Sequence, residues 1–160
     1  MILYHGSSVA VKDPLLRPTL RPLDFGTGLY VTSDLPEAVR WARLTAKRRG
    51  TDSSFVTSYE LAQEQLSSLR VLCFAGPDRE WLEVVVKNRL DTGSLELPYD
   101  VVAGPVADEQ TISVVLLYLD GIIDATTAVS RLLTYRVTSQ YAFKTTAALQ
   151  LLQLKEVLEV

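Results

Sequence analysis

The chain has 160 residues, enough for one domain whose continuous core needs no disulfide or metal to stabilise it. Its formal net charge of −3 argues against a chain-wide basic surface for nucleic acid, and its single cysteine excludes an internal disulfide. Because it has neither a signal-peptide pattern nor an apolar run near the roughly 18 residues of a membrane span, we predict one soluble, cytoplasmic domain over residues 1–160.

The first third of the chain combines short strand patterns with one strongly marked helix. We predict strands over 2–5 and 28–32, joined through an irregular, proline-rich loop over 14–24. The sequence Asp-Leu-Pro-Glu at 34–37 is typical of a helix N-terminus and predicts a helix that ends near Arg49. The residues of this helix that we expect to face the core are Leu35, Ala38, Trp41 and Ala42.

A basic cluster at 47–49 ends this helix just before Gly50. Such a cluster could contact nucleic acid. We favour the simpler interpretation, because cations near a helix C-terminus interact well with the negative end of the helix dipole.

The rest of the chain continues the alternation of strands and helices. Residues 55–61 predict a half-buried strand, and the apolar run 69–74 predicts a buried strand that contains Cys73. Further helices are expected over 78–90, 108–119, 124–133 and 146–152, and further strands over 99–106, 140–143 and 154–160. This order predicts an α+β fold with a curved, largely antiparallel sheet flanked by helices.

Residue counts and incomplete motifs argue against several kinds of functional site. One histidine, His5, and one cysteine, Cys73, cannot supply a standard zinc ligand set, so no metal is expected. Residues 24–26 read Asp-Phe-Gly as in protein kinases, but a kinase needs a second motif with its own histidine. Residues 26–28 lack the third glycine of a dinucleotide fingerprint and precede a strand instead of a helix. A nucleophilic Cys73 paired with His5 is disfavoured by the apolar sequence around the cysteine.

Four segments of the chain together resemble a known family. They read LYHGS at 3–7, DFGTGLYVTSDLPEAVRWA at 24–42, VAGPVADEQ at 102–110 and SQYAFKTTAALQLL at 139–152. In this order they resemble a bacterial family of uncharacterised domains related to ADP-ribosyltransferases of the diphtheria-toxin and poly(ADP-ribose)-polymerase type. That family is often found as the toxin of a toxin–antitoxin pair. The resemblance covers nearly the whole chain and is weakest in its middle.

The resemblance implies an ADP-ribosyltransferase-like fold in which the sheet is split in two and NAD binds between the halves. It implies a catalytic set from three strands, made of His5, Tyr30 and Gln140. At position 140 the wider superfamily often has glutamate, so Gln140 departs from its pattern. The residues that we expect to contact NAD, as the substrate, are His5, Gly6, Ser7, Arg21, Gly28 and Tyr30.

The chemistry of these residues suits cleavage of the nicotinamide–ribose bond, which passes through an oxocarbenium-like transition state as in glycoside hydrolysis. His5 can hydrogen-bond a ribose hydroxyl, and Tyr30 offers a face on which nicotinamide can stack. The backbone of Gly6 can approach the carboxamide closely because no side chain intervenes. The Gln140 amide can hold a ribose hydroxyl, but it supplies no negative charge to the transition state.

His5, Tyr30 and Gln140 supply neither a carboxylate nor a group for the NAD phosphates, and other charged residues are candidates for these two roles. Asp108 and Glu109 could supply the missing carboxylate, although capping of the following helix is the favoured role. Arg17 and Arg21 could bind the NAD phosphates, since guanidinium groups suit them, and a purely structural role fits equally well.

We predict an NAD-dependent mono-ADP-ribosyltransferase that acts as an intracellular toxin and is inhibited by a cognate antitoxin protein. An NAD glycohydrolase, with water as the acceptor, is the enzymatic alternative. A non-catalytic module that binds ADP-ribose or a protein is the alternative from another class. The missing glutamate favours this module, whereas the presence of both His5 and Tyr30 opposes it.

Overall fold

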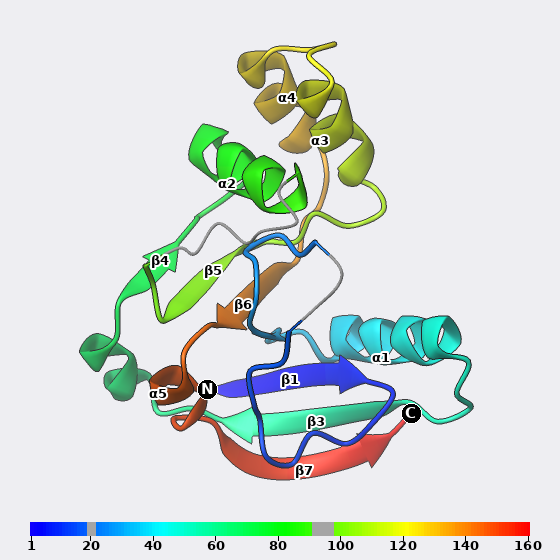
Figure 1. Ribbon diagram of the computed structural model, residues 1–160, viewed down its shortest axis with the longest axis vertical. Coiled ribbons are helices and arrows are strands. Elements are labelled where there is room, and N and C mark those ends of the chain that lie inside the picture. The colour runs from blue at the N-terminus through cyan, green and yellow to red at the C-terminus, as the bar shows by residue number, and fades with distance from the viewer. Residues whose placement is uncertain (19–21, 91–97) are drawn as a thin grey trace.

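The computed structural model describes residues 1–18, 22–90 and 98–160, and they form two sheets flanked by helices (Figure 1). The first sheet is antiparallel, with the strand order β1 (Ile2–Ser7), β3 (Phe55–Glu60) and β7 (Gln153–Glu159). The second sheet is mixed, with the strand order β2 (Leu29–Val31), β6 (Ser139–Phe143), β5 (Val101–Pro105) and β4 (Val71–Cys73). In it, β4 runs parallel to β5, whereas the other neighbouring strands are antiparallel. The predicted α+β class with largely antiparallel, helix-flanked sheets is confirmed.

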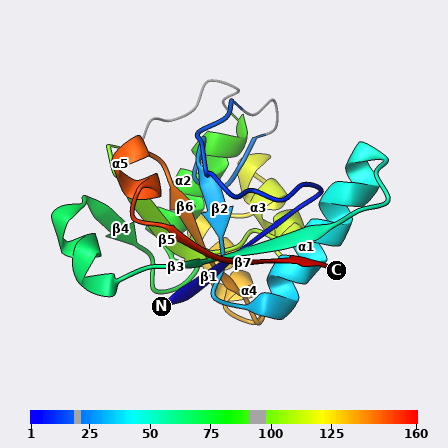
Figure 2. The ribbon, with the colours of Figure 1, turned by 90° about the horizontal axis from the view of Figure 1, so that it is seen from below.

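The two sheets meet at one backbone bridge and then separate. Tyr4 of β1 and Thr32, just after β2, exchange two backbone hydrogen bonds of 2.8 and 2.9 Å. An apolar core fills the space between the sheets, and it includes Leu3, Val31 and Phe143. Seen from below, the strands of the first sheet lie across the end of the second sheet (Figure 2). The chain therefore has two strand layers that are joined near β1 and β2 and open beside this junction.

The helices cover different parts of this framework. They are α1 (Leu35–Arg49), α2 (Arg79–Leu90), α3 (Ile112–Leu119), α4 (Ala125–Leu132) and α5 (Thr146–Leu149), and a 3₁₀ helix spans Gln63–Ser68. Helix α1 lies along the first sheet, whereas α2, α3 and α4 gather at the far end of the second (Figure 1). A second core joins these three helices to β5 and β6 through buried residues such as Trp81, Val102 and Leu132.

Helix α1 begins and ends as its sequence predicts. The Asp34 carboxylate accepts a hydrogen bond of 3.3 Å from the backbone N–H of Glu37, and Gly50 ends the helix in the left-handed conformation with φ of 63°. The reciprocal half of a capping box is not formed, because the Glu37 carboxylate binds the Arg40 guanidinium at 2.7 Å. The Asp34 N–H instead donates to the Thr32 hydroxyl.

A stripe of alanines lets α1 approach the sheet closely. Ala38 and Ala42 are fully buried, as predicted, and they face Gly6 of β1. A Cβ atom on Gly6 would lie 2.0 Å from the Ala38 carbonyl oxygen and 2.7 Å from the Ala42 nitrogen. We expected the bare backbone of Gly6 to serve a ligand. The structure shows that the close approach of helix α1 also requires the absence of a side chain at this position, and the predicted ligand contact stays a prediction.

Three predictions about burial are wrong. Strand β3 was expected to be half-buried, but it is the central strand of its sheet and residues 56–59 are all buried. Strand β4 was expected to be buried, yet it lies at the edge of the second sheet and exposes Cys73. Leu35 was expected to face the core, but it is 37% exposed because it lies at the start of α1. An apolar run alone does not distinguish a central strand from an edge strand.

Candidate functional site

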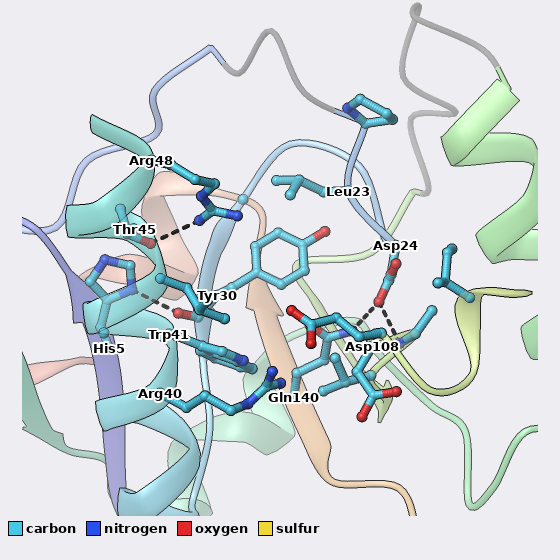
Figure 3. Close-up of a pocket in the computed structure, with 18 of the residues that line it drawn as sticks. His5, Leu23, Asp24, Tyr30, Arg40, Trp41, Thr45, Arg48, Asp108 and Gln140 are labelled. Atoms are coloured by element: carbon cyan, nitrogen blue, oxygen red, sulfur yellow. Dashed lines mark hydrogen bonds between the residues drawn. The ribbon is translucent and has the colours of Figure 1, made fainter. Parts of the chain in front are cut away.

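A cavity of about 480 Å³ opens beside the junction of the two sheets. This volume lies within the range of roughly 300–1,000 Å³ that is usual for small-molecule sites. Strand β1 and helix α1 form one wall, and β2, β6 and the loop over residues 22–28 form the other (Figure 3). The lining includes five of the residues predicted for catalysis or NAD contact, which are His5, Gly6, Gly28, Tyr30 and Gln140, and also the candidate carboxylates Asp108 and Glu109.

His5 is half-buried in β1, and a backbone contact to the opposite sheet fixes its ring. Its Nδ1 lies 2.8 Å from the Tyr30 carbonyl oxygen, which can only accept, so Nδ1 carries the proton (Figure 3). Burial lowers the pKa of His5 below its ordinary value of 6.5, and the nearby Arg49 lowers it further, while the bond to Tyr30 opposes both effects. At neutral pH the ring is therefore uncharged, and its Nε2 is a hydrogen-bond acceptor.

We expect the lowered pKa of His5 to make stability fall as pH decreases below about 6.5. The unfolded chain takes up the imidazole proton more readily than the folded chain, so protonation favours unfolding in this window. The lowered pKa values of Asp100 and Asp124 act below about 3.8 and do not overlap with it. Chemical denaturation at pH 7.5 and 5.5 measures the effect. His5→Asn should show a clearly smaller loss between these two pH values, and an equal loss would contradict the assignment.

Tyr30 presents its ring to the cavity while its hydroxyl is bound to the neighbouring loop. The hydroxyl donates to the Gly26 carbonyl oxygen at 2.7 Å and accepts from the Phe25 N–H at 3.0 Å. The ring lies nearly parallel to that of the buried Phe25, with centroids 6.5 Å apart. Burial and the nearby Asp24 raise the pKa of Tyr30, so the phenol stays neutral. These contacts hold the aromatic face in one orientation without any ligand.

The loop over residues 24–28 is itself tied to the second sheet. Lys144, just after β6, donates to the carbonyl oxygens of Phe25 and Thr27. Phe25 is fully buried and stacks against Phe74, and Gly26 allows the turn with φ of 76°. This part of the cavity wall is therefore held at several points.

A buried carboxylate behind Gln140 is the main feature that the sequence did not reveal. Asp24 is 5% exposed and accepts from the Gln140 Nε2 at 2.7 Å and from the Ala107 N–H at 2.9 Å. Its other oxygen binds the Arg89 guanidinium through Nε at 2.9 Å and Nη2 at 2.6 Å. Asp24, Arg89 and Gln140 all line the cavity. Asp24 was read only as part of an incomplete kinase motif, because its partners are 65 and 116 residues away in the sequence.

Helix α1 contributes a wall that the sequence also left unassigned. Its cavity-lining residues are Arg40, Trp41, Leu44, Thr45 and Arg48. Trp41 was predicted to face the core, and this interpretation is wrong because it is half-buried in the cavity wall. Arg48 lies in the last turn of α1, as predicted, and in addition lines the cavity. The cavity-lining residues recur at helical spacing, so they form one face of α1, next to the face that carries the alanine stripe. The sequence signal that could have predicted this wall is the row of large side chains next to the stripe of alanines on the same helix.

Asp108 and Glu109 precede α3 and line the cavity, and Asp108 lies across the cavity from Arg48 (Figure 3). The Asp108 carboxylate accepts from the backbone N–H groups of Gln110 and Thr111 at 3.0 and 3.1 Å, so it holds the turn that precedes α3. It was predicted to cap the helix itself, but α3 begins at Ile112 and its N-cap residue is Thr111. Glu109 is exposed at the rim. Both carboxylates raise the pKa of Arg40, to a smaller extent than its contact with Glu37.

The remaining residues with a predicted role are not found in the described lining of the cavity. Ser7 is buried in β1 but does not belong to the cavity lining. Arg17 is exposed and is also outside the lining, and Arg21 falls outside the described residues. Cys73 does not line the cavity either, so no nucleophilic pair with His5 forms. Across residues 1–18, 22–90 and 98–160, no group of three or more His, Cys, Asp or Glu side chains could hold a metal ion.

The fold and cavity define an α+β domain with a polar, aromatic-lined cleft at the junction of two small sheets. Residues 1–154 match the family model described as "Protein of unknown function (DUF3990)", and the chain belongs to this family. No curated protein and no solved structure matches the chain. In the part of the chain that the structure describes, none of the helices has the length and apolar character needed to cross a membrane.

Proposed function

We propose that this protein is an NAD-dependent mono-ADP-ribosyltransferase. The observation that carries the proposal is the convergence of His5, Tyr30 and Gln140 from three strands on one cavity between two sheets. In the reaction, the bond between the ribose C1′ and the nicotinamide nitrogen breaks, and nicotinamide leaves with the bonding electrons. A nucleophile of the acceptor then forms a bond to C1′ and releases its proton. The protein mainly has to hold the dinucleotide in position, where most of the rate advantage lies.

Each wall of the cavity offers groups suited to one part of NAD. The neutral His5 can accept a hydrogen bond from a ribose hydroxyl at Nε2, and the fixed Tyr30 ring can stack on nicotinamide. Arg40 and Arg48 on α1 line the cavity and are further candidates for the phosphates, beside the predicted Arg21, which lies outside the described residues. The arrangement of two small sheets around a cavity agrees with the ADP-ribosyltransferase-like fold that the sequence resemblance implies.

From the same resemblance we propose that the protein acts in the cytoplasm as the toxin of a toxin–antitoxin pair. Its partner would be a small antitoxin protein that blocks the activity. The wild-type chain should then arrest growth when it is produced in bacteria without that partner.

We expect purified wild-type protein incubated with labelled NAD to release nicotinamide and to transfer the label to a macromolecule in a bacterial lysate. Tyr30→Leu should lose most of this activity because it removes the stacking face. Tyr135→Leu is the matched control, since Tyr135 is exposed and does not line the cavity. Chromatography of free nicotinamide and of labelled macromolecules measures both reactions.

Other results of this assay would support the alternatives. Nicotinamide release without transfer of the label would indicate an NAD glycohydrolase. Binding of NAD or ADP-ribose without turnover would indicate a non-catalytic module, which the glutamine at position 140 favours. Equal activity of Tyr30→Leu and wild type would contradict the role given to Tyr30.

A further inference from the structure

The orientation of the Gln140 amide is determined by its neighbours. A carboxylate and a carbonyl oxygen can only accept hydrogen bonds, so the group that faces Asp24 and Pro105 must be the amide nitrogen. Its two N–H groups are used by the Asp24 carboxylate at 2.7 Å and the Pro105 carbonyl at 3.3 Å. None of the described residues donates a hydrogen bond to the amide oxygen. This oxygen is therefore the atom of Gln140 that is left for a ligand in the cavity.

Asp24 cannot take that ligand itself. A carboxylate has about four acceptor positions, and those of Asp24 are occupied by Gln140, by the Ala107 N–H and by two nitrogens of Arg89. The guanidinium of Arg89 also neutralises its charge locally. Asp24 thus acts on the cavity through the residues that it binds.

We propose that Asp24 is a positioning residue that holds the Gln140 amide with its oxygen toward the ribose of bound NAD. The Asp24–Gln140 pair then supplies a hydrogen-bond acceptor where related enzymes have a carboxylate. A hydrogen bond from an amide N–H to a charged carboxylate also polarises the amide and makes its oxygen a stronger acceptor. The role in catalysis rests on the proposed NAD reaction, whereas the orientation of the amide follows from the contacts alone.

Asp24→Asn tests the proposal because it keeps the shape of the side chain and removes its charge. The amide introduced at position 24 can donate to Gln140, so the Gln140 amide can turn its nitrogen toward the cavity. We expect kcat for nicotinamide release to fall at least about tenfold, with a change in KM for NAD of less than about threefold. Asp52→Asn, in an exposed loop, is the matched control and should behave as wild type.

The double variant Asp24→Asn/Gln140→Glu exchanges the two chemical groups. The carboxylate introduced at position 140 can accept from the amide introduced at position 24 and still present an acceptor to the ribose. We expect the double variant to recover most of the activity lost in Asp24→Asn. Unchanged kcat in Asp24→Asn would overturn the proposal, as would a double variant no more active than Asp24→Asn.

Gln140→Glu alone keeps the ion pair between Asp24 and Arg89. It therefore still tests the proposal if the Asp24→Asn protein does not fold. Two carboxylates at this distance oppose each other's ionisation, and the carboxyl group introduced at position 140 should titrate above the ordinary range of glutamate. The double variant should return this titration toward the ordinary range. Carbon-13 NMR of the introduced carboxyl group measures it, and identical titration in both variants would contradict the contact on which the positioning depends.

This titration needs no enzymatic turnover. If the wild-type protein releases no nicotinamide, the proposed reaction fails and the catalytic role of Asp24 fails with it. A titration that is higher in Gln140→Glu than in the double variant still supports, in that case, the contact by which Asp24 orients the amide.

Discussion

His5→Asn is expected to reduce nicotinamide release by roughly 100-fold, the scale of losing one preorganised hydrogen bond in an active site. The asparagine amide can keep the contact that Nδ1 makes with the Tyr30 carbonyl oxygen, so the cavity wall should remain in place. It cannot reach the position of Nε2, where we expect the ribose hydroxyl to bind. Release of nicotinamide from NAD measures the loss, and growth of producing cells should recover in parallel.

His5→Gln separates this role from a structural one. The longer side chain can present an acceptor near the position of Nε2 but cannot keep the short contact with Tyr30. If His5 binds the ligand, His5→Gln should retain more activity than His5→Asn. If His5 only joins the two sheets, the order of the two variants should be reversed. Melting curves for both variants distinguish loss of activity from loss of the fold.

Gly6→Ala is expected to lower the free energy of unfolding by about 3 kcal/mol or more, at the upper end of overpacking effects. The added Cβ would lie 2.0 Å from the Ala38 carbonyl oxygen, which is a rigid part of α1, so the helix has to move away from β1. Because α1 also forms one wall of the cavity, binding of NAD should weaken together with stability. Urea denaturation and NAD titration measure the two effects.

Gly76→Ala is the matched control for this substitution. A Cβ atom there would meet nothing within 4 Å, and the backbone of Gly76 is not in the left-handed conformation that disfavours alanine. Replacement of such a glycine by alanine changes stability little or raises it slightly, through the entropy of the unfolded chain. A Gly6→Ala protein as stable as Gly76→Ala would show that α1 can shift without cost.

Local signals in the sequence were sufficient for most of the elements. Asp34 and Asp124, at the predicted starts of two helices, each accept a hydrogen bond from the backbone N–H three residues later, and Asp78 does the same before α2. The strand predicted over 140–143 is present as β6. Capping and turn residues act through neighbours in the chain, so a single sequence contains the necessary information. Helix α5 ends at Leu149, three residues before its predicted end.

The site could be predicted only in part. His5, Tyr30 and Gln140 were selected from the resemblance, and what they bind stays a prediction. Asp24 carried no local signal, because its role depends on Arg89 and Gln140, which reach it only in the folded chain. The same limit explains why Cys73 was misplaced. Whether a short apolar strand is central or peripheral depends on which strands pair beside it, and among the described residues β4 pairs with β5 alone.

Tyr30 serves the cavity through two chemically independent parts. Its main-chain oxygen orients the imidazole of His5, while its phenol binds the 24–28 loop. An exchange of the side chain at this position would leave the carbonyl, and hence the histidine, where they are. A different side chain at this position would therefore change the surface of the cavity without disturbing the contact that orients the imidazole.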